Sequence, residues 1–251
     1  MHRLVYSIFL LALLSTPVQA QTRDRVNQGV EWLGISSVVK LSPRFGVFVD
    51  GQFRFARQLE NMQHMLRFSL DYNVNSKFSV SPIGYSFIWN YKYGVQPVTI
   101  INNEHRLYQQ LQYKHAIGKF FFTHRFRTEE RFIQNHTVDP EGEYSNFQFR
   151  IRHRIWCSRP IGKDKIEPKT WYLAVFYEGF MSWGKLVTFD NKIDQSRLFF
   201  GPGYQFNGHV NLQAGPYYQH LIKRQGLQEE NNLGVFVQLN YNFDLTKPAV
   251  K

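Results

Sequence analysis

Residues 66–74 read LRFSLDYNV, and their chemistry alternates at every position. The even-numbered positions carry Leu, Phe, Leu, Tyr and Val, whereas the odd-numbered positions carry Arg, Ser, Asp and Asn. Successive side chains of a β-strand point to opposite faces, so this stretch predicts a strand with one apolar and one polar face. Residues 233–243 (LGVFVQLNYNF) and 147–155 (FQFRIRHRI) follow the same period.

The alternation continues along the chain on both sides of that stretch, and no segment shows a convincing helical period. We predict about eleven strands, at residues 30–40, 45–57, 62–74, 78–92, 103–115, 119–132, 145–158, 170–181, 194–206, 209–223 and 232–243. Many of these segments contain 12 or more residues, whereas strands of soluble sheets typically contain ~5–6. Such lengths suit tilted strands that cross a membrane and extend beyond it.

The connections between these segments alternate in length. Tight turns are expected at residues 41–44, 75–77, 117–118 and 207–208, with a longer turn at 158–169. Longer polar loops are expected at residues 93–102, 134–144, 182–193 and 224–231. Short turns at one end and long loops at the other are typical of bacterial outer-membrane barrels.

We therefore predict an all-β fold, an antiparallel transmembrane β-barrel that occupies residues 21–251 as one domain. Bacterial barrels of one chain have an even number of strands, so we expect ten to twelve strands and favour twelve. Counting back from the last strand places the start of the first segment at the loop side. Either one strand is miscounted, or residues 21–29 thread back or add a short strand.

Residues 1–20 read MHRLVYSIFLLALLSTPVQA, with an early positive charge, a short apolar core and small residues at the end. This pattern is typical of a secretory signal peptide. The predicted cleavage precedes Gln21. No cysteine lies near this position, so we expect no lipid anchor. The segment directs export, and we expect the mature chain in the outer membrane of a Gram-negative bacterium.

The composition of the 251-residue chain excludes several classes of protein. Aromatic residues make up 17% and charged residues only 20%, which argues against disorder. We find no glycine-rich phosphate turn and no other cofactor motif. The single cysteine, Cys157, cannot form a disulfide within the chain. Although the net charge is +11, the basic residues are spread along strands and the chain is exported, so we expect no nucleic acid partner.

In a bilayer the apolar face of each strand must point to lipid, so the charged face must line the lumen. This assigns Glu31, Arg54, Arg67 and Arg154 to the interior, together with Asp50 and Asp71. The candidate site is a polar cluster that faces the lumen: Arg106, Arg125, Arg127, Glu129, Arg131, Arg150, Arg152 and Glu178. Aromatic residues such as Phe68, Phe126 and Trp171 are assigned to the outer face.

Two functions are open for such a lumen. A basic lining favours anionic solutes, as rings of arginine do in anion pores, so a narrow porin-like pore could pass a small anion. Alternatively, the arginines and glutamates pair with one another and hold a structural barrel closed. The expected partners are outer-membrane lipid, lipopolysaccharide (at Lys92, Lys185 and Lys192) and the barrel-assembly machinery.

Several short motifs resemble, in order and spacing, an uncharacterised outer-membrane family known as domain of unknown function 2490. They are Trp32, residues 104–106 (EHR), 125–132 (RFRTEERF), 149–152 (FRIR) and 177–180 (YEGF). The resemblance covers about residues 26–243. It implies a β-barrel in a Gram-negative outer membrane, and it implies no activity.

Two other functions are considered. A lipid-modifying enzyme would need a nucleophile beside a basic histidine; His124 and His153 fall on the apolar faces of neighbouring strands, but no Gly-x-Ser-x-Gly motif is present. The nine histidines show no tight metal-binding spacing, so we expect no catalytic residue, cofactor or metal. The other alternative is a soluble periplasmic β protein.

Overall fold

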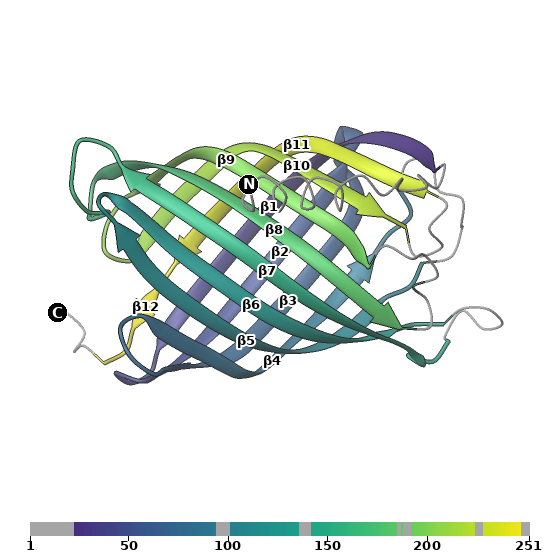
Figure 1. Cartoon of the computed structure of the whole chain (residues 1–251), viewed down its shortest axis with the longest axis horizontal. Coiled ribbons are helices and arrows are strands. Elements are labelled where there is room, and N and C mark those ends of the chain that lie inside the picture. The colour runs from purple at the N-terminus through teal and green to yellow at the C-terminus, as the bar shows by residue number, and fades with distance from the viewer. Residues whose placement is uncertain are drawn as a thin grey trace, which may run out of the picture.

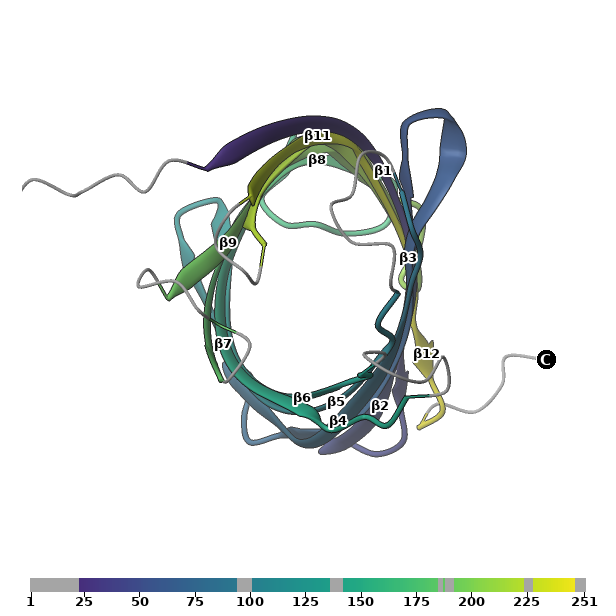
Figure 2. The same cartoon turned by 90° about the vertical axis from the view of Figure 1, so that its right-hand side faces the viewer.

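The computed structural model describes residues 23–93, 101–135, 142–184, 187, 192–223 and 228–246, and the predicted signal peptide lies outside them. These residues form one closed β-barrel (Figures 1 and 2). Its strands are β1 (Asp24–Lys40), β2 (Phe45–Ala56), β3 (Glu60–Asn73), β4 (Phe78–Asn90), β5 (Glu104–Ile117), β6 (Phe120–Ile133), β7 (Asn146–Pro160), β8 (Thr170–Gly184), β9 (Ile193–Gln205), β10 (Val210–Ile222), β11 (Gln228–Tyr241) and the short β12 (Phe243–Asp244). One 3-10 turn, Arg57–Leu59, joins β2 to β3.

Each of the strands β1 to β11 pairs with its sequence neighbour in antiparallel fashion. Because eleven is an odd number, β1 and β11 run in the same direction, and the barrel closes through a parallel pair. The register of this pair extends from Asp24 opposite Gln228 to Ser36 opposite Asn240. The two residues of β12 then pair with the far end of β1.

This architecture confirms the predicted β-barrel and the range of ten to twelve strands. The twelve strands favoured from the sequence comprise eleven long strands and the short β12, and the pair of β1 and β11 that closes the barrel is parallel. The first segment does begin at the loop side, as the strand count required, and it is longer at its start than predicted. Within the described residues, no helix is long and apolar enough to cross a membrane.

The two rims of the barrel differ. We call turn end the rim that bears the connections 41–44, 74–77, 118–119, 161–169 and 206–209, and loop end the opposite rim. Gly118 takes a φ of +57° in the two-residue turn between β5 and β6, a conformation that favours glycine. The turn at 161–169 is the longest at its end, and its Ile166 packs back against the apolar side chains inside the barrel.

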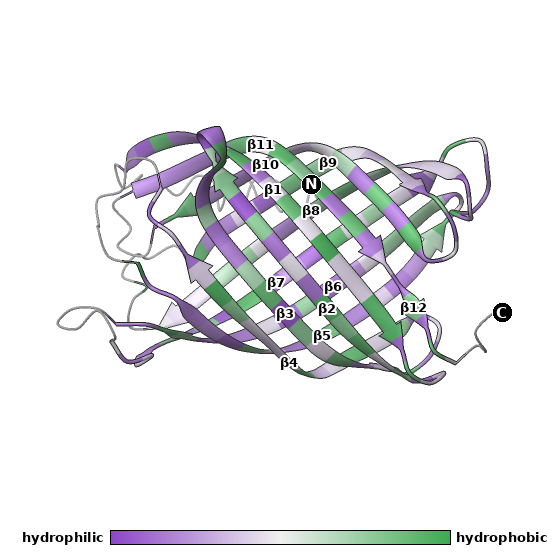
Figure 3. Ribbon diagram, turned by 180° about the vertical axis from the view of Figure 1, so that it is seen from behind, coloured by the Kyte–Doolittle hydropathy of each residue, from purple (hydrophilic) through white to green (hydrophobic). Residues whose placement is uncertain are grey.

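Burial alternates along the strands, as the sequence period predicts, and the colouring of Figure 3 follows it. In β8, Tyr172, Phe176 and Glu178 point inward and are buried, whereas Trp171 and Tyr177 point outward and are exposed. The outer surface of the barrel is therefore largely apolar, and its interior holds most of the buried charged groups.

One interior position depends on a glycine. The register of β4 against β5 shifts between Ser81 and Gly84, and the ring of Tyr108 then lies directly over Gly84. A Cβ atom at Gly84 would come within 2.2 Å of that ring. The Tyr108 hydroxyl donates a hydrogen bond to the backbone carbonyl of Phe68 at 3.2 Å, so this contact connects three neighbouring strands.

Candidate functional site

The interior of the barrel has two chemically different walls. Strands β5 to β7 contribute most of the buried arginines, namely Arg106, Arg125, Arg127, Arg131, Arg150 and Arg152. Strands β8 to β11, together with β1, contribute buried aromatic residues, namely Trp32, Tyr172, Phe176, Phe180, Phe199, Tyr217 and Phe236. We call these two surfaces the arginine wall and the aromatic wall.

Two carboxylates bind the arginines near the middle of the barrel. Glu178 accepts hydrogen bonds from Arg125 at 2.5 Å and from Arg152 at 2.8 Å, and it lies 3.6 Å from Arg197. Glu129 accepts from Arg150 and Arg152. Because Arg152 contacts both carboxylates, the groups form one network, which we call the septum: Arg125, Arg127, Glu129, Arg150, Arg152, Glu178 and Arg197.

The septum reaches the opposite side of the lumen through cation–π contacts. The guanidinium carbon of Arg197 lies 5.0 Å from the centre of the Trp32 ring, and that of Arg54 lies 4.0 Å from the same ring. Arg54 also donates to Gln63 at 2.6 Å. These contacts place the guanidinium groups of Arg54 and Arg197 against Trp32, the residue of the aromatic wall that lies on β1.

A second group of ion pairs lies nearer the loop end. Glu104 accepts two hydrogen bonds from the Nη2 of Arg131, both at 2.8 Å, and one from Arg106 Nε at 2.9 Å. Arg131 also donates to Gln148. A third group joins Arg67 to Asp50, with Gln52 donating to the same carboxylate oxygen at 2.9 Å.

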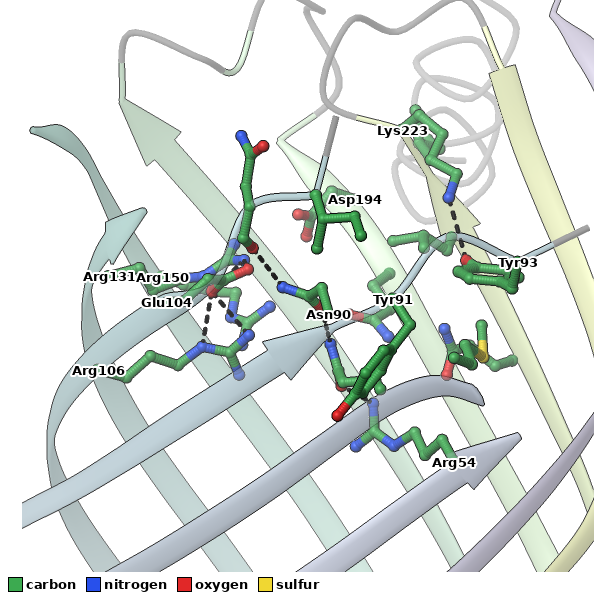
Figure 4. Close-up of a pocket in the computed structure, with 18 of the residues that line it drawn as sticks. Arg54, Asn90, Tyr91, Tyr93, Glu104, Arg106, Arg131, Arg150, Asp194 and Lys223 are labelled. Carbon is green, nitrogen blue, oxygen red and sulfur yellow. Dashed lines mark hydrogen bonds and ion pairs between the residues drawn. The ribbon is translucent and has the colours of Figure 1, made fainter. Parts of the chain in front are cut away.

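Two cavities lie on either side of the septum. The cavity at the loop end has a volume of about 350 Å³ and includes Tyr91, Lys92 and Asp194 (Figure 4). The cavity at the turn end has a volume of about 500 Å³ and includes Arg154 and Trp156. Arg54, Arg106 and Arg197 line both cavities, so charged side chains form the boundary between them.

The loop end is partly covered by the segment that follows β4. The Tyr93 hydroxyl donates to Glu230 at 3.0 Å and accepts from Lys223 at 3.2 Å, and Lys223 also pairs with Glu230 at 2.7 Å. Figure 4 shows Tyr93 and Lys223 directed toward one another at the edge of the cavity. Since β4 and β11 lie on different sides of the barrel, this contact extends over the lumen.

The structure brings the predicted polar cluster together. The eight residues named from the sequence are all buried, and each has at least one ion pair or hydrogen bond with another interior side chain. Arg54, Arg67, Asp50 and Asp71 also point inward. The assignment of Glu31 to the interior is wrong, because Trp32 occupies the inward position and Glu31 takes the outward one.

The aromatic wall was missed from the sequence, along with Arg197 and Glu104. A signal was present, because residues 170–181 carry apolar side chains at both odd and even positions. When both faces of a strand are apolar, one face must pack against other apolar side chains of the protein and the other must point to apolar surroundings. Phe199 and Phe236, whose ring centres are 4.9 Å apart, belong to the wall formed in this way.

His124 and His153 lie on the outer face of β6 and β7. Their rings stack with centres 5.7 Å apart, and His115 of β5 stacks on His124 at 5.3 Å. Their hydrogen-bond partners in the described part of the chain are one another, and no serine is among them. The same part of the chain contains no cluster of three or more His, Cys, Asp or Glu side chains suited to a metal ion.

Comparisons with known proteins give one family and one solved structure. A family model described as "Protein of unknown function (DUF2490)" matches residues 31–231. No match is found among curated proteins. A similar solved structure is OmpT (in-vitro folded), an outer membrane protein of Vibrio cholerae, with 10% identity, coverage of 85% of this chain and 95% of that chain, and a TM-score of 0.32.

Proposed function

The chain belongs to the DUF2490 family, and we propose that it is a β-barrel of the Gram-negative outer membrane whose lumen is held closed by ion pairs. The family resemblance predicted from the sequence is confirmed by this match. The septum carries the proposal, because Glu129 and Glu178 bind arginines from β6, β7 and β9 and leave charged side chains between the two cavities.

The outer surface supports a membrane location. Each of the eleven long strands exposes at least one large apolar side chain, for example Leu33, Phe53, Phe68, Ile83, Leu111, Phe126, Ile151, Val175, Leu198, Tyr218 and Val235. A water-soluble protein rarely exposes an apolar surface of this extent. In a bilayer, by contrast, apolar side chains face lipid, and a closed barrel satisfies all the backbone hydrogen bonds.

The strand lengths agree with this location. A strand of 14 residues, such as β5, rises ~3.3 Å per residue and at a tilt of ~40° spans roughly 35 Å along the barrel axis. The apolar band of outer-membrane barrels is ~25 Å tall, so the strands extend beyond it. Aromatic residues lie near both rims, with Trp171 and Tyr241 at the turn end and Trp89 and Phe147 at the loop end.

In this arrangement the turn end faces the periplasm and the loop end faces outward, which is the usual orientation. Export by the signal peptide and insertion by the barrel-assembly machinery belong to the proposal. The phosphates of lipopolysaccharide would meet the predicted Lys92 and Lys192, which lie at the loop end, after β4 and before β9. Lys185, predicted for the same role, lies outside the described residues.

A narrow anion pore is the second candidate, because basic groups outnumber acidic ones inside the barrel. The described interior holds nine buried arginines, Arg54, Arg67, Arg106, Arg125, Arg127, Arg131, Arg150, Arg152 and Arg197. It holds six buried carboxylates, Asp50, Glu104, Glu129, Glu178, Asp194 and Glu230. A surplus of arginine attracts anions, but here most of the arginines are engaged with a carboxylate or amide partner.

The proposal is tested in two steps. Detergent-folded protein is first run in electrophoresis with and without boiling, and the current through planar bilayers that contain the folded protein is then recorded. We expect a band whose mobility changes on boiling and a folded protein that shows no conductance steps. Discrete steps with anion preference would favour the pore and contradict the closed lumen. Release of the native protein from membranes by carbonate washing would favour the soluble periplasmic alternative and contradict the membrane location.

A further inference from the structure

The cavity at the turn end contains a guanidinium group, that of Arg154, which forms no ion pair with any described residue. Arg154 of β7 lines this cavity, and its Nε is buried without a hydrogen bond. Within the described residues, no carboxylate lies within ion-pair distance of Arg154, whereas Asp50 pairs with Arg67 and Glu178 pairs with Arg125. Arg154 is partly buried and lies opposite Glu178 in the register of β7 and β8, but the two side chains form no ion pair. A guanidinium group that faces a cavity without a paired carboxylate can accept an anion from outside the protein.

The surroundings of Arg154 are basic on one side and aromatic on the other. Eight basic side chains and two carboxylates line the cavity. The guanidinium carbon of Arg154 lies 5.5 Å from the centre of the Trp156 ring and 5.8 Å from that of Phe176. The cavity therefore presents an unsatisfied positive group at the edge of the aromatic wall.

We propose that the cavity at the turn end binds an organic anion with a flat apolar body. A carboxylate, sulfonate or phosphate group of the ligand would pair with Arg154, whose planar fork matches such groups in a bidentate manner. The apolar body would pack against Trp156 and Phe176, where offset or edge-to-face ring contacts are favourable. An inorganic anion would pair with Arg154 alone, and Trp156 and Phe176, which stack with ring centres 5.5 Å apart, would gain no contact from it.

The dimensions and the entrance of the cavity fit this class of ligand. A volume of about 500 Å³ lies within the ~300–1,000 Å³ typical of sites for small molecules. Toward the turn end the lining includes the amides Gln205, Asn211 and Asn240 and the basic Lys114. The two carboxylates of the lining, Asp50 and Glu178, each form an ion pair with an arginine, so the lining is basic overall and suits an anion.

The probe for the test is 4-nitrobenzenesulfonate, an aromatic anion that quenches tryptophan fluorescence. Trp32 and Trp156 line the cavity, whereas Trp89 and Trp171 are exposed on the outer face. We expect saturable quenching in folded, detergent-solubilised protein, with a Kd at least about tenfold lower than that of the Arg154→Gln variant, as expected for a charge-assisted contact. Arg154→Lys keeps the charge and should retain part of the affinity.

Arg159→Gln is the matched control. Arg159 is on the same strand but is exposed outside, over the Phe120 ring, so this variant removes the same charge and should bind as the wild type does. Equal affinity of the wild type and Arg154→Gln would overturn the proposal, as would equally tight binding of potassium sulfate. Each variant is first shown to fold by its mobility change on boiling. Because binding is measured in detergent, conductance in bilayers would contradict the closed lumen without affecting this result.

Discussion

The Tyr93 hydroxyl donates a hydrogen bond of 3.0 Å to the carboxylate of Glu230. This bond connects the segment after β4 to β11 over the loop end of the barrel. Glu230 is fully buried and also pairs with Lys223. The contact therefore closes part of the loop end with buried polar groups.

We expect Tyr93→Phe to weaken this closure. A hydrogen bond to a charged group contributes about 1.5–3 kcal/mol, so the free energy of unfolding in urea should fall by about that amount. Tyr218→Phe is the control, because its hydroxyl donates to Asn231 at an exposed site on the outer surface. Equal losses in the two variants would show that the Tyr93 contact has no special role.

The septum predicts a large effect for Glu129→Gln. This change leaves Arg150 and Arg152 with a neutral amide in place of the carboxylate that they share, and removal of one partner of a buried ion pair costs about 3–5 kcal/mol. The measurement is urea unfolding of the barrel in lipid vesicles. Glu130→Gln, one position along β6 on the outer face, should change the stability by less than about 0.5 kcal/mol.

Arg154 and Arg152 should respond in opposite ways to neutralisation. Arg152→Gln removes a cation that binds Glu129 and Glu178, so we expect a loss of about 3 kcal/mol in unfolding free energy. Arg154→Gln removes a cation with no paired carboxylate, close to other arginines of the same cavity, so the stability should stay the same or rise. A large loss in Arg154→Gln, measured by the same urea titration, would show that Arg154 has a structural role.

The contact between Gly84 and Tyr108 predicts a steric effect. Gly84→Ala would place a Cβ within 2.2 Å of the Tyr108 ring, and the resulting overpacking should cost about 1–3 kcal/mol. Gly51→Ala is the control, because nothing lies within 4 Å of a Cβ atom at that position. Thermal unfolding of both variants in detergent compares them, and an equally small effect in both would contradict the interpretation.

Much of the fold follows from a local property of the sequence. The alternation in residues 66–74 predicts that Arg67 points inward and Phe68 outward, and both side chains do so. The same rule places Arg125, Arg127 and Glu129 on one side of β6. It fails at Glu31, because residues 30–35 carry apolar side chains at both parities, and the period then does not identify the inward face.

Contacts between strands that are distant in the sequence cannot be predicted from this local alternation. That Glu178 of β8 binds Arg125 of β6, or that Arg197 lies over Trp32, depends on the barrel's curvature and on the length of each side chain. The odd number of strands likewise becomes apparent only where β1 meets β11.

The sequence by itself determined the strands, their two faces and the two unlike rims, because a period of two and the spacing of turns are properties of neighbouring residues. The tertiary structure alone decided the parallel closure, the ion pairs of the septum, the position of Arg154 and which aromatic side chains meet in the aromatic wall. These features depend on which side chains, from strands far apart in the chain, meet in the interior of the barrel. Only the closed barrel determines which charged side chains lie close enough to form ion pairs.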